Sequence, residues 1–107
     1  MAFTAKTLAD GQLADSEAAI YTVPENTKTY VRFLSLYNVS GSEQTITLWI
    51  RRNGGSSRKW RRFVLNENEQ ADALGSAVLM LSAGDAIRAA STNASSVDYV
   101  ISGVEET

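Results

Sequence analysis

Few of the side chains that usually carry out enzymatic chemistry occur in this sequence of 107 residues, which contains no cysteine and no histidine. Without histidine there is no ordinary proton shuttle near pH 7, no usual activator of a nucleophilic serine, and no imidazole ligand for a transition metal. Carboxylates are present, but mostly in predicted turns, and no calcium-loop spacing occurs. We therefore expect a protein that is not an enzyme and that holds no metal and no cofactor.

The densest group of functional side chains is cationic. Six of the ten basic residues lie within residues 51–62, together with one tryptophan, and no acidic residue occurs between Glu43 and Glu67. We take seven residues of this segment as the candidate partner-binding site: Arg51, Arg52, Arg58, Lys59, Trp60, Arg61 and Arg62.

Three interpretations of this basic segment are open. Cations on an exposed strand deter edge-to-edge aggregation. Arginine and tryptophan are also enriched in protein interfaces, where a guanidinium can hold a carboxylate by two hydrogen bonds. In the third interpretation the partner is a nucleic acid, whose phosphates are bound by the arginines and whose bases stack on Trp60. The formal net charge of −2 and the acidic flanks argue against nucleic acid, so we favour a protein interface.

The elements that position the basic segment are predicted from periodicity. In residues 44–50, Ile46, Leu48 and Ile50 alternate with Thr45, Thr47 and Trp49, which is typical of a half-buried strand. Asn53-Gly54-Gly55-Ser56 has the residue types of a hairpin turn. A return strand then covers residues 58–65. The sequence thus predicts a hairpin with the cations near its tip.

The remaining chain predicts further short strands over residues 17–23, 28–39, 77–82, 86–91 and 97–104, separated by turn residues. Residues 66–76 are expected to form a loop that crosses between sheets. Residues 1–16 are weakly patterned and are predicted as an N-terminal arm, either flexible or ordered on a neighbouring subunit. Residues 17–107 are then an all-β domain, an antiparallel, jelly-roll-like β-sandwich of seven to eight strands.

The longest predicted strand, residues 28–39, carries apolar side chains on both faces. Simple alternation places Tyr30, Leu34 and Leu36 on one face, with Val31, Phe33 and Tyr37 on the other. This pattern is typical of a central strand, or of one covered by a neighbouring subunit. We therefore expect a homo-oligomer.

Nothing in the sequence predicts a membrane protein. The longest apolar run, residues 77–81, is far shorter than the ~20 residues that span a bilayer. The N-terminus has no apolar stretch of the kind that a secretory signal needs, so export by that route is not expected.

Several short motifs occur in a suggestive order: Thr22-Val23-Pro24, Asn38-Val39-Ser40-Gly41, residues 45–48, residues 81–87 and residues 102–105. In this order they resemble a class of small tailed-bacteriophage virion proteins with a β-sandwich fold. The resemblance implies a non-enzymatic structural protein of the virion that decorates or cements the capsid. It also implies contact with the major capsid protein or another virion protein, and a trimer. In that hypothesis the basic hairpin grips an acidic surface, with Trp60 as the apolar anchor.

Two alternatives remain beside capsid decoration. A phage neck or tail accessory protein would share the fold. A glycan-binding module would use Trp49, Trp60 or Tyr99 as stacking platforms.

Overall fold

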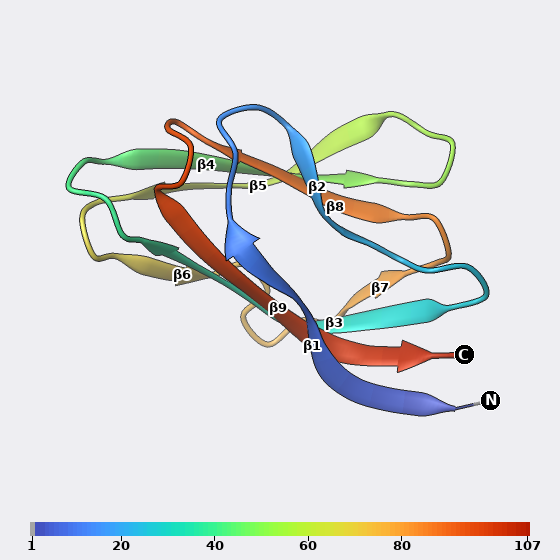
Figure 1. The fold of residues 1–107 in the computed structure, drawn as a ribbon. Coiled ribbons are helices and arrows are strands. Elements are labelled where there is room, and N and C mark those ends of the chain that lie inside the picture. The colour runs from blue at the N-terminus through green and yellow to red at the C-terminus, as the bar shows by residue number, and fades with distance from the viewer. Residues whose placement is uncertain (1) are drawn as a thin grey trace.

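The protein is described by a computed structural model that covers residues 2–107, and within them the chain forms nine β-strands and no helix (Figure 1). The strands are β1 (Phe3–Gln12), β2 (Ala18–Thr22), β3 (Lys28–Asn38), β4 (Gln44–Arg51), β5 (Ser57–Leu65), β6 (Gln70–Asp72), β7 (Leu79–Leu81), β8 (Ala86–Ser91) and β9 (Val97–Glu106). All of their pairings are antiparallel.

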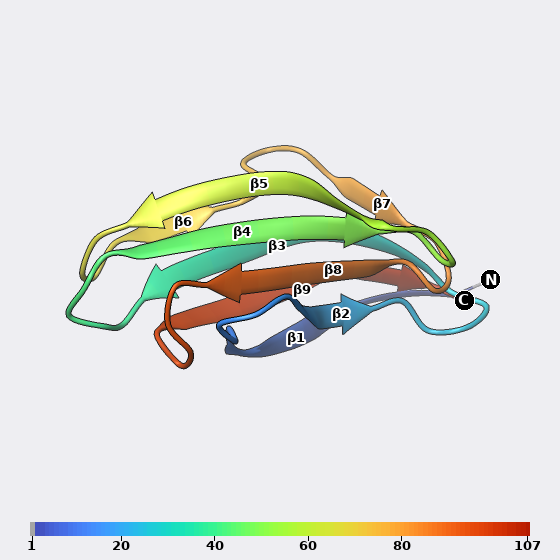
Figure 2. The ribbon, with the colours of Figure 1, turned by 90° about the horizontal axis from the view of Figure 1, so that it is seen from above.

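The strands form two sheets that pack face to face (Figure 2). One sheet has four strands in the order β2-β8-β4-β5, and the other has five, with β1-β9-β3-β6 in line and β7 also paired with β3. Strand β6 pairs with residues 35–37 of β3 and β7 with residues 29–31, so the two occupy one interrupted strand position. The resulting order is that of a jelly roll, which confirms the predicted β-sandwich with slightly more strands than expected.

The additional strands lie where the sequence predicted none. Strand β6 is a three-residue strand inside the predicted crossing loop, too short for periodicity to reveal. Strand β1 occupies most of the predicted N-terminal arm and pairs with β9 from Phe3–Glu106 to Gln12–Asp98. The residue that follows β1, Leu13, is buried in the core. Residues 3–16 are therefore part of the sandwich and not a separate arm; Met1 lies outside the described residues.

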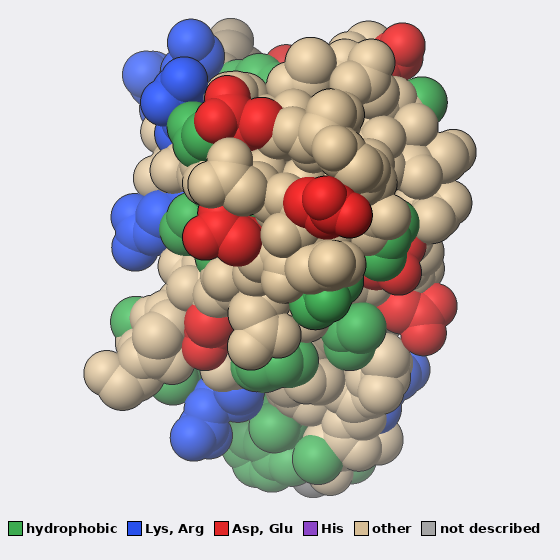
Figure 3. Space-filling view, turned by 90° about the vertical axis from the view of Figure 1, so that its left-hand side faces the viewer, with side chains coloured by type: hydrophobic (Ala, Val, Ile, Leu, Met, Phe, Trp, Pro, Cys, Tyr) green, Lys and Arg blue, Asp and Glu red, His purple; other side chains and the backbone are tan. Residues whose placement is uncertain are grey.

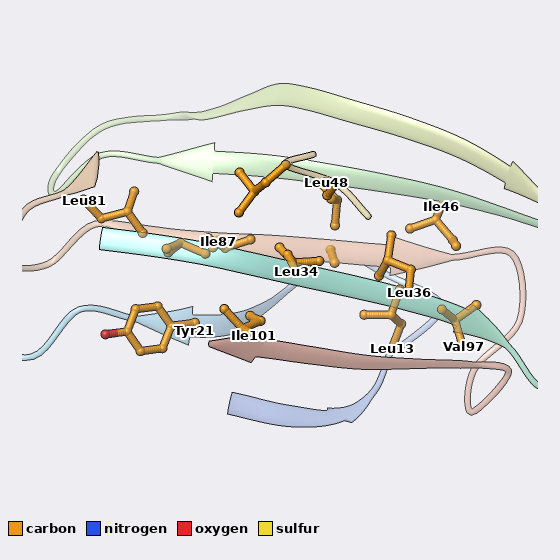
Figure 4. Close-up of a cluster of buried hydrophobic side chains, with 14 of the residues drawn as sticks. Leu13, Tyr21, Leu34, Leu36, Ile46, Leu48, Leu81, Ile87, Val97 and Ile101 are labelled. Carbon is orange, nitrogen blue, oxygen red and sulfur yellow. The ribbon is translucent and has the colours of Figure 1, made fainter. Parts of the chain in front are cut away.

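The core lies between the two sheets (Figure 4). Its fully buried side chains come from strands of both sheets, including Leu34 and Leu36 of β3, Ile46 and Leu48 of β4, and Ile101 of β9. The alternation predicted for residues 44–50 is confirmed, since Ile46 and Leu48 are fully buried while the residues between them are not. This alternation turns one face of β4 towards the core and the other outwards.

The faces predicted for the long strand β3 are wrong in part. A β-bulge interrupts the pairing of β3 with β9 between Val31 and Phe33. Val31 and Leu34 are both fully buried as a result. A bulge adds one residue and so reverses the parity of all later side chains. Tyr30, Phe33 and Tyr37 therefore lie together on the outer face, and β3 is central between β9 and the β6–β7 strand position.

The buried side chain of Asn38 fixes the connection from β3 to β4. Its Nδ2 donates to the backbone oxygens of Ser42 at 2.8 Å and Leu65 at 2.9 Å, while its Oδ1 accepts from the backbone N–H of Ser40 at 2.9 Å. Asparagine often replaces backbone partners in turns in this way. The turn predicted at residues 38–42 is thus built around one side chain.

Candidate interaction surfaces

The tip of the β4–β5 hairpin is held by two of the predicted partner-binding arginines. Arg51 Nε donates to the backbone oxygen of Gly55 at 3.0 Å. Arg52 Nη1 lies 2.8 Å from Oδ2 of Asp85, on the turn that precedes β8. Both side chains therefore support the local fold, and the ion pair occupies the guanidinium of Arg52.

A second β-bulge divides the cations of β5. The pairing of β4 with β5 shifts between Leu48–Arg61 and Trp49–Lys59, which leaves Trp60 without a partner on β4. Trp60 is half-buried and packs against the core. Arg61 lies with its Cζ 5.1 Å from the centre of the Trp60 ring, a cation–π contact, and its Nε donates to the backbone oxygen of Ala73 at 3.2 Å. Trp60 and Arg61 therefore cover part of the core at the edge of the sandwich beside β5.

The remaining three predicted cations lie on different surfaces. Arg58 pairs with inward-facing Ile50 and lines a hollow at the open side of the sandwich. Lys59 pairs with Trp49 and Arg62 with Thr47, both on the outward face of β4. The seven predicted site residues are thus not one patch, because the bulge and the internal contacts distribute them over three places.

Ser56 and Lys59 have the spacing of a Ser-x-x-Lys pair. Such a pair meets when both residues lie on one face of a helix. Here Ser56 is in the turn and Lys59 is on an extended strand. The Ser-x-x-Lys spacing therefore does not place the Lys59 amine and the Ser56 hydroxyl on one helical face, and it does not indicate an activated serine at this position.

The outer surface of the four-stranded sheet gathers cations around one tryptophan. Trp49 faces outwards between two cross-strand neighbours, Lys59 on β5 and Arg88 on β8. Residues directly opposite on neighbouring strands share a face. We call this surface the basic face, defined by Trp49 with Arg51, Lys59, Arg62 and Arg88. Arg88 was not predicted from the sequence, because it lies far from the basic segment and joins it only through the β4–β8 pairing.

One carboxylate lies beside the basic face. Glu17 Oε2 accepts hydrogen bonds from Ser57 Oγ at 2.5 Å and from Arg88 Nε at 2.6 Å. The hydrogen bond from Ser57, followed by that from Arg88, lowers the pKa of the Glu17 carboxyl. Glu17 therefore stays ionised near neutral pH and orients Arg88.

The outer surface of the five-stranded sheet has the opposite character. Large apolar and aromatic side chains line it in neighbouring rows, with Tyr30 opposite Met80 and Val104, and Val100 opposite Ser35. Phe33 and Tyr37 continue the surface along β3. We call it the aromatic face, defined by Tyr30, Phe33, Tyr37, Met80, Val100 and Val104.

Carboxylates surround the aromatic face. They are Asp10 on β1, Asp72 on β6, and Asp98 and Glu106 on β9, each paired with an outward-facing residue. Tyr30 Oη donates to Glu106 Oε1 at 2.7 Å, and this hydrogen bond raises the pKa of Tyr30. The same sheet also carries two cations on β3, Lys28 and Arg32. Because the four carboxylates outnumber these two cations, the outer surface of the sheet is acidic in balance.

The hollows of the described surface are open. A hollow of about 480 Å³ lies at the end of the sandwich beside Asn26, Lys28 and Glu106, and one of about 320 Å³ lies on the aromatic face between Phe33, Tyr37 and Asp72. Within residues 2–107, no group of three or more His, Cys, Asp and Glu side chains could hold a metal ion. Among the same residues, no helix has the length and apolar character to cross a membrane.

Comparison with known proteins identifies a similar fold. No family model and no curated protein matches the chain. One solved structure, described as "Bacillus endospore appendages form a novel family of disulfide-linked pili", is similar with a TM-score of 0.60 at 15% sequence identity. The match covers 98% of this chain and 88% of that chain. At this identity the similarity shows the fold alone.

This finding corrects the function that the sequence predicted. Decoration of a bacteriophage capsid and a place in the virion were wrong, because the similar structure is an endospore appendage protein and not a phage protein. The motifs that carried the resemblance stabilise turns: Asn38 holds residues 38–42, and Asp85 accepts from the backbone N–H of Ser82 within residues 81–87. Such turns serve a jelly roll whatever its function, so they could not identify a family.

Proposed function

We propose that this protein is a non-enzymatic structural subunit that assembles with copies of itself into a pilus-like fibre on a cell or spore surface. The observation that supports this most directly is the extent of the structural similarity, which covers 98% of the chain. Almost all of the chain thus corresponds in fold to a protein described as forming pili. The surface of residues 2–107 offers two large faces of opposite character, and one of its open hollows lies on the aromatic face itself.

The chemistry of assembly has to differ from that of the similar protein. Those pili are described as disulfide-linked, whereas this chain contains no cysteine. Contacts between its subunits are then non-covalent and come from packing, hydrogen bonds and ion pairs. Reducing agents should leave such a fibre intact, and denaturing detergent alone should dissolve it.

The polymer that we propose differs in form from the trimer that the resemblance implied. A closed ring or trimer needs a rotation that returns to the first subunit, whereas two different surfaces on opposite sides of one subunit generate an open polymer. We therefore propose a linear or helical polymer in which each copy uses two distinct surfaces.

The experiment is assembly of the purified full-length chain. Negative-stain electron microscopy and sedimentation velocity, from micromolar to millimolar concentration, should show fibres whose abundance is the same with and without dithiothreitol. A single species with the mass of one subunit at every concentration would contradict the proposal. Immunogold labelling of the source cells or spores should then mark surface fibres.

A further inference from the structure

We propose that subunits stack front to back, with the basic face of one copy packed on the aromatic face of the next. This inference rests on the proposed fibre function and specifies its contact. It commits to one occupant for both surfaces, a second copy of this chain, because the two surfaces are complementary in charge and in apolar character.

The aromatic face exposes more large apolar side chains than is expected for a sheet face that stays in contact with solvent. Five of the eight large hydrophobic side chains that are exposed within residues 2–107 point out from this sheet, and Phe3 and Met80 are more than 60% exposed. Four of the five, Phe33, Tyr37, Met80 and Val100, lie in neighbouring rows across β3, β7 and β9 and form a patch, while Phe3 lies on the neighbouring edge strand β1. Contiguous patches of this kind mark interaction sites.

The charges of the two faces match. The aromatic face is bordered by Asp10, Asp72, Asp98 and Glu106. On the basic face, the side chains of Lys59 and Arg62 make no hydrogen bond or ion pair with any other described residue, and both are exposed. Cations placed beside one another repel unless an anionic partner offsets them. Four carboxylates on a second copy supply that partner.

An apolar anchor lies at the middle of the basic face. Trp49 is partly buried, like Trp60, and lies between Lys59 and Arg88. On the aromatic face, the hollow of about 320 Å³ beside Phe33 and Tyr37 offers a surface against which an indole ring can pack. Tryptophan that packs in a hollow surrounded by charged pairs is the typical arrangement of an interface hot spot.

The two faces lie on opposite sides of the sandwich and have room for a stable contact. Figure 3 looks onto the end that carries the β3–β4 and β5–β6 connections. Lys and Arg lie along the side of β5 from the top to the bottom, and hydrophobic side chains gather at the bottom, over the five-stranded sheet. The molecule measures 45 by 26 by 20 Å, so a face along its length can bury about 800 Å² per partner, the standard interface size. A contact between opposite faces leaves each end of a stack with one unused face, so addition continues.

The contact is tested with two variants that each disable one face. Lys59→Glu with Arg62→Glu reverses charge on the basic face, and Asp98→Lys with Val100→Lys places cations on the aromatic face. Each variant alone should lose fibres and sediment as one subunit, with association weakened about 100-fold or more. In an equimolar mixture one pair of faces is intact and the other pair is charge-swapped, with glutamates facing lysines, so the mixture should form species of two or more subunits that neither variant forms alone.

The matched control is Glu43→Lys with Glu67→Lys, because both acids are exposed in loops outside the two faces. This control should form fibres like the natural chain. Circular dichroism establishes that each variant is folded. Carbodiimide cross-linking of wild-type fibres needs no variant: Lys59 should link to a carboxylate of the aromatic face, one of Asp10, Asp72, Asp98 or Glu106.

The outcomes separate the inference from the proposed function. If the wild type never assembles, both fail. If it forms fibres and either variant does so equally well, the fibre remains and the front-to-back contact is refuted, with contact through the sheet edges as the alternative. Two folded monomeric variants that do not combine in a mixture also overturn the inference, as does a dominant Lys59 cross-link to a carboxylate elsewhere.

Discussion

Arg52 and Asp85 form an ion pair that joins two turns far apart in the sequence, with Nη1 2.8 Å from Oδ2. The Asp85 carboxylate, whose side chain is only 6% exposed, also accepts from the backbone N–H groups of Asn53 and Ser82, each at 2.9 Å. One carboxylate thus satisfies donors from the β4–β5 turn and from the turn before β8. The contact orients the hairpin on which the basic face is built.

The substitution Asp85→Ala should destabilise the subunit by about 2–4 kcal/mol, because it leaves two backbone donors and one guanidinium without their acceptor. Urea unfolding followed by circular dichroism measures this loss. The control is Asp15→Ala, since Asp15 is exposed in a loop and should tolerate the change. Equal stability of the two variants would contradict a structural role for Asp85.

The same carboxylate predicts how stability depends on acid. Burial raises the pKa of Asp85, but the hydrogen bonds from Ser82 and Asn53 and the contact with Arg52 outweigh it and lower the pKa below its ordinary 3.8. A carboxyl with a lowered pKa stabilises the fold above its ordinary value, and this contribution disappears as the pH falls through the folded value. Stability should therefore drop below about pH 4 in the natural chain and less steeply in Asp85→Ala.

Periodicity assigned the two faces of a strand correctly where no extra residue interrupts the alternation in that strand. In β4, the residues from Ile46 to Leu48 alternate without interruption, so the inward face could be assigned from sequence. In β3, the bulge between Val31 and Phe33 reversed the faces, and no residue there signals the extra position. Strand β1 was missed because an edge strand with few large apolar residues carries little alternation.

The candidate site was predicted only in part, for the same reason. Sequence proximity grouped seven residues of the β4–β5 hairpin, whereas the bulge at Trp60 and the ion pair of Arg52 separate them. Arg88 joins Lys59 only through strand pairing across Trp49, which depends on the order of strands in the sheet. Local patterns predict strands, but long-range pairing decides which side chains share a surface.

Gly103 of β9 should tolerate no side chain. A Cβ at this position would lie 2.2 Å from the backbone oxygen of Tyr30 and 3.0 Å from Cα of Val31, both on the neighbouring strand. Since backbone atoms of a central strand cannot move aside cheaply, Gly103→Ala should cost about 3 kcal/mol or more. Thermal unfolding by calorimetry measures the effect. Gly41→Ala is the matched control, because no atom lies within 4 Å of a Cβ built there.

Tyr21 should make the fold sensitive to alkali. Its hydroxyl lies 2.8 Å from Thr29 Oγ1 and donates to Glu105 Oε2 at 2.7 Å. Burial, together with the nearby Glu105 carboxylate, raises the pKa of Tyr21 from 10.0 to about 12. An acid with a raised pKa stabilises the fold fully below its ordinary value, and the contribution is lost as the pH rises from about 10 to about 12.

Replacement of Tyr21 by phenylalanine tests this dependence. Tyr21→Phe should lower stability near neutral pH by about 1 kcal/mol, the usual net value of such a hydrogen bond. Its stability should then fall less between pH 10 and 12 than that of the natural chain. Tyr37→Phe serves as the control, since Tyr37 is exposed and makes only a long contact of 3.4 Å to Asn68. Parallel pH profiles for the natural chain and Tyr21→Phe would exclude this role.

The two tryptophans should have opposite effects when replaced by alanine. Trp60 packs against the core and beneath Arg61, so Trp60→Ala should destabilise the isolated subunit by about 2–3 kcal/mol. Trp49 lies on the outer face, so Trp49→Ala should change subunit stability by less than about 1 kcal/mol but reduce fibre formation. Urea unfolding and sedimentation of both variants measure the two effects. A Trp60→Ala variant that is fully stable yet unable to assemble would restore Trp60 as the interface anchor that the sequence predicted, and would remove that role from Trp49.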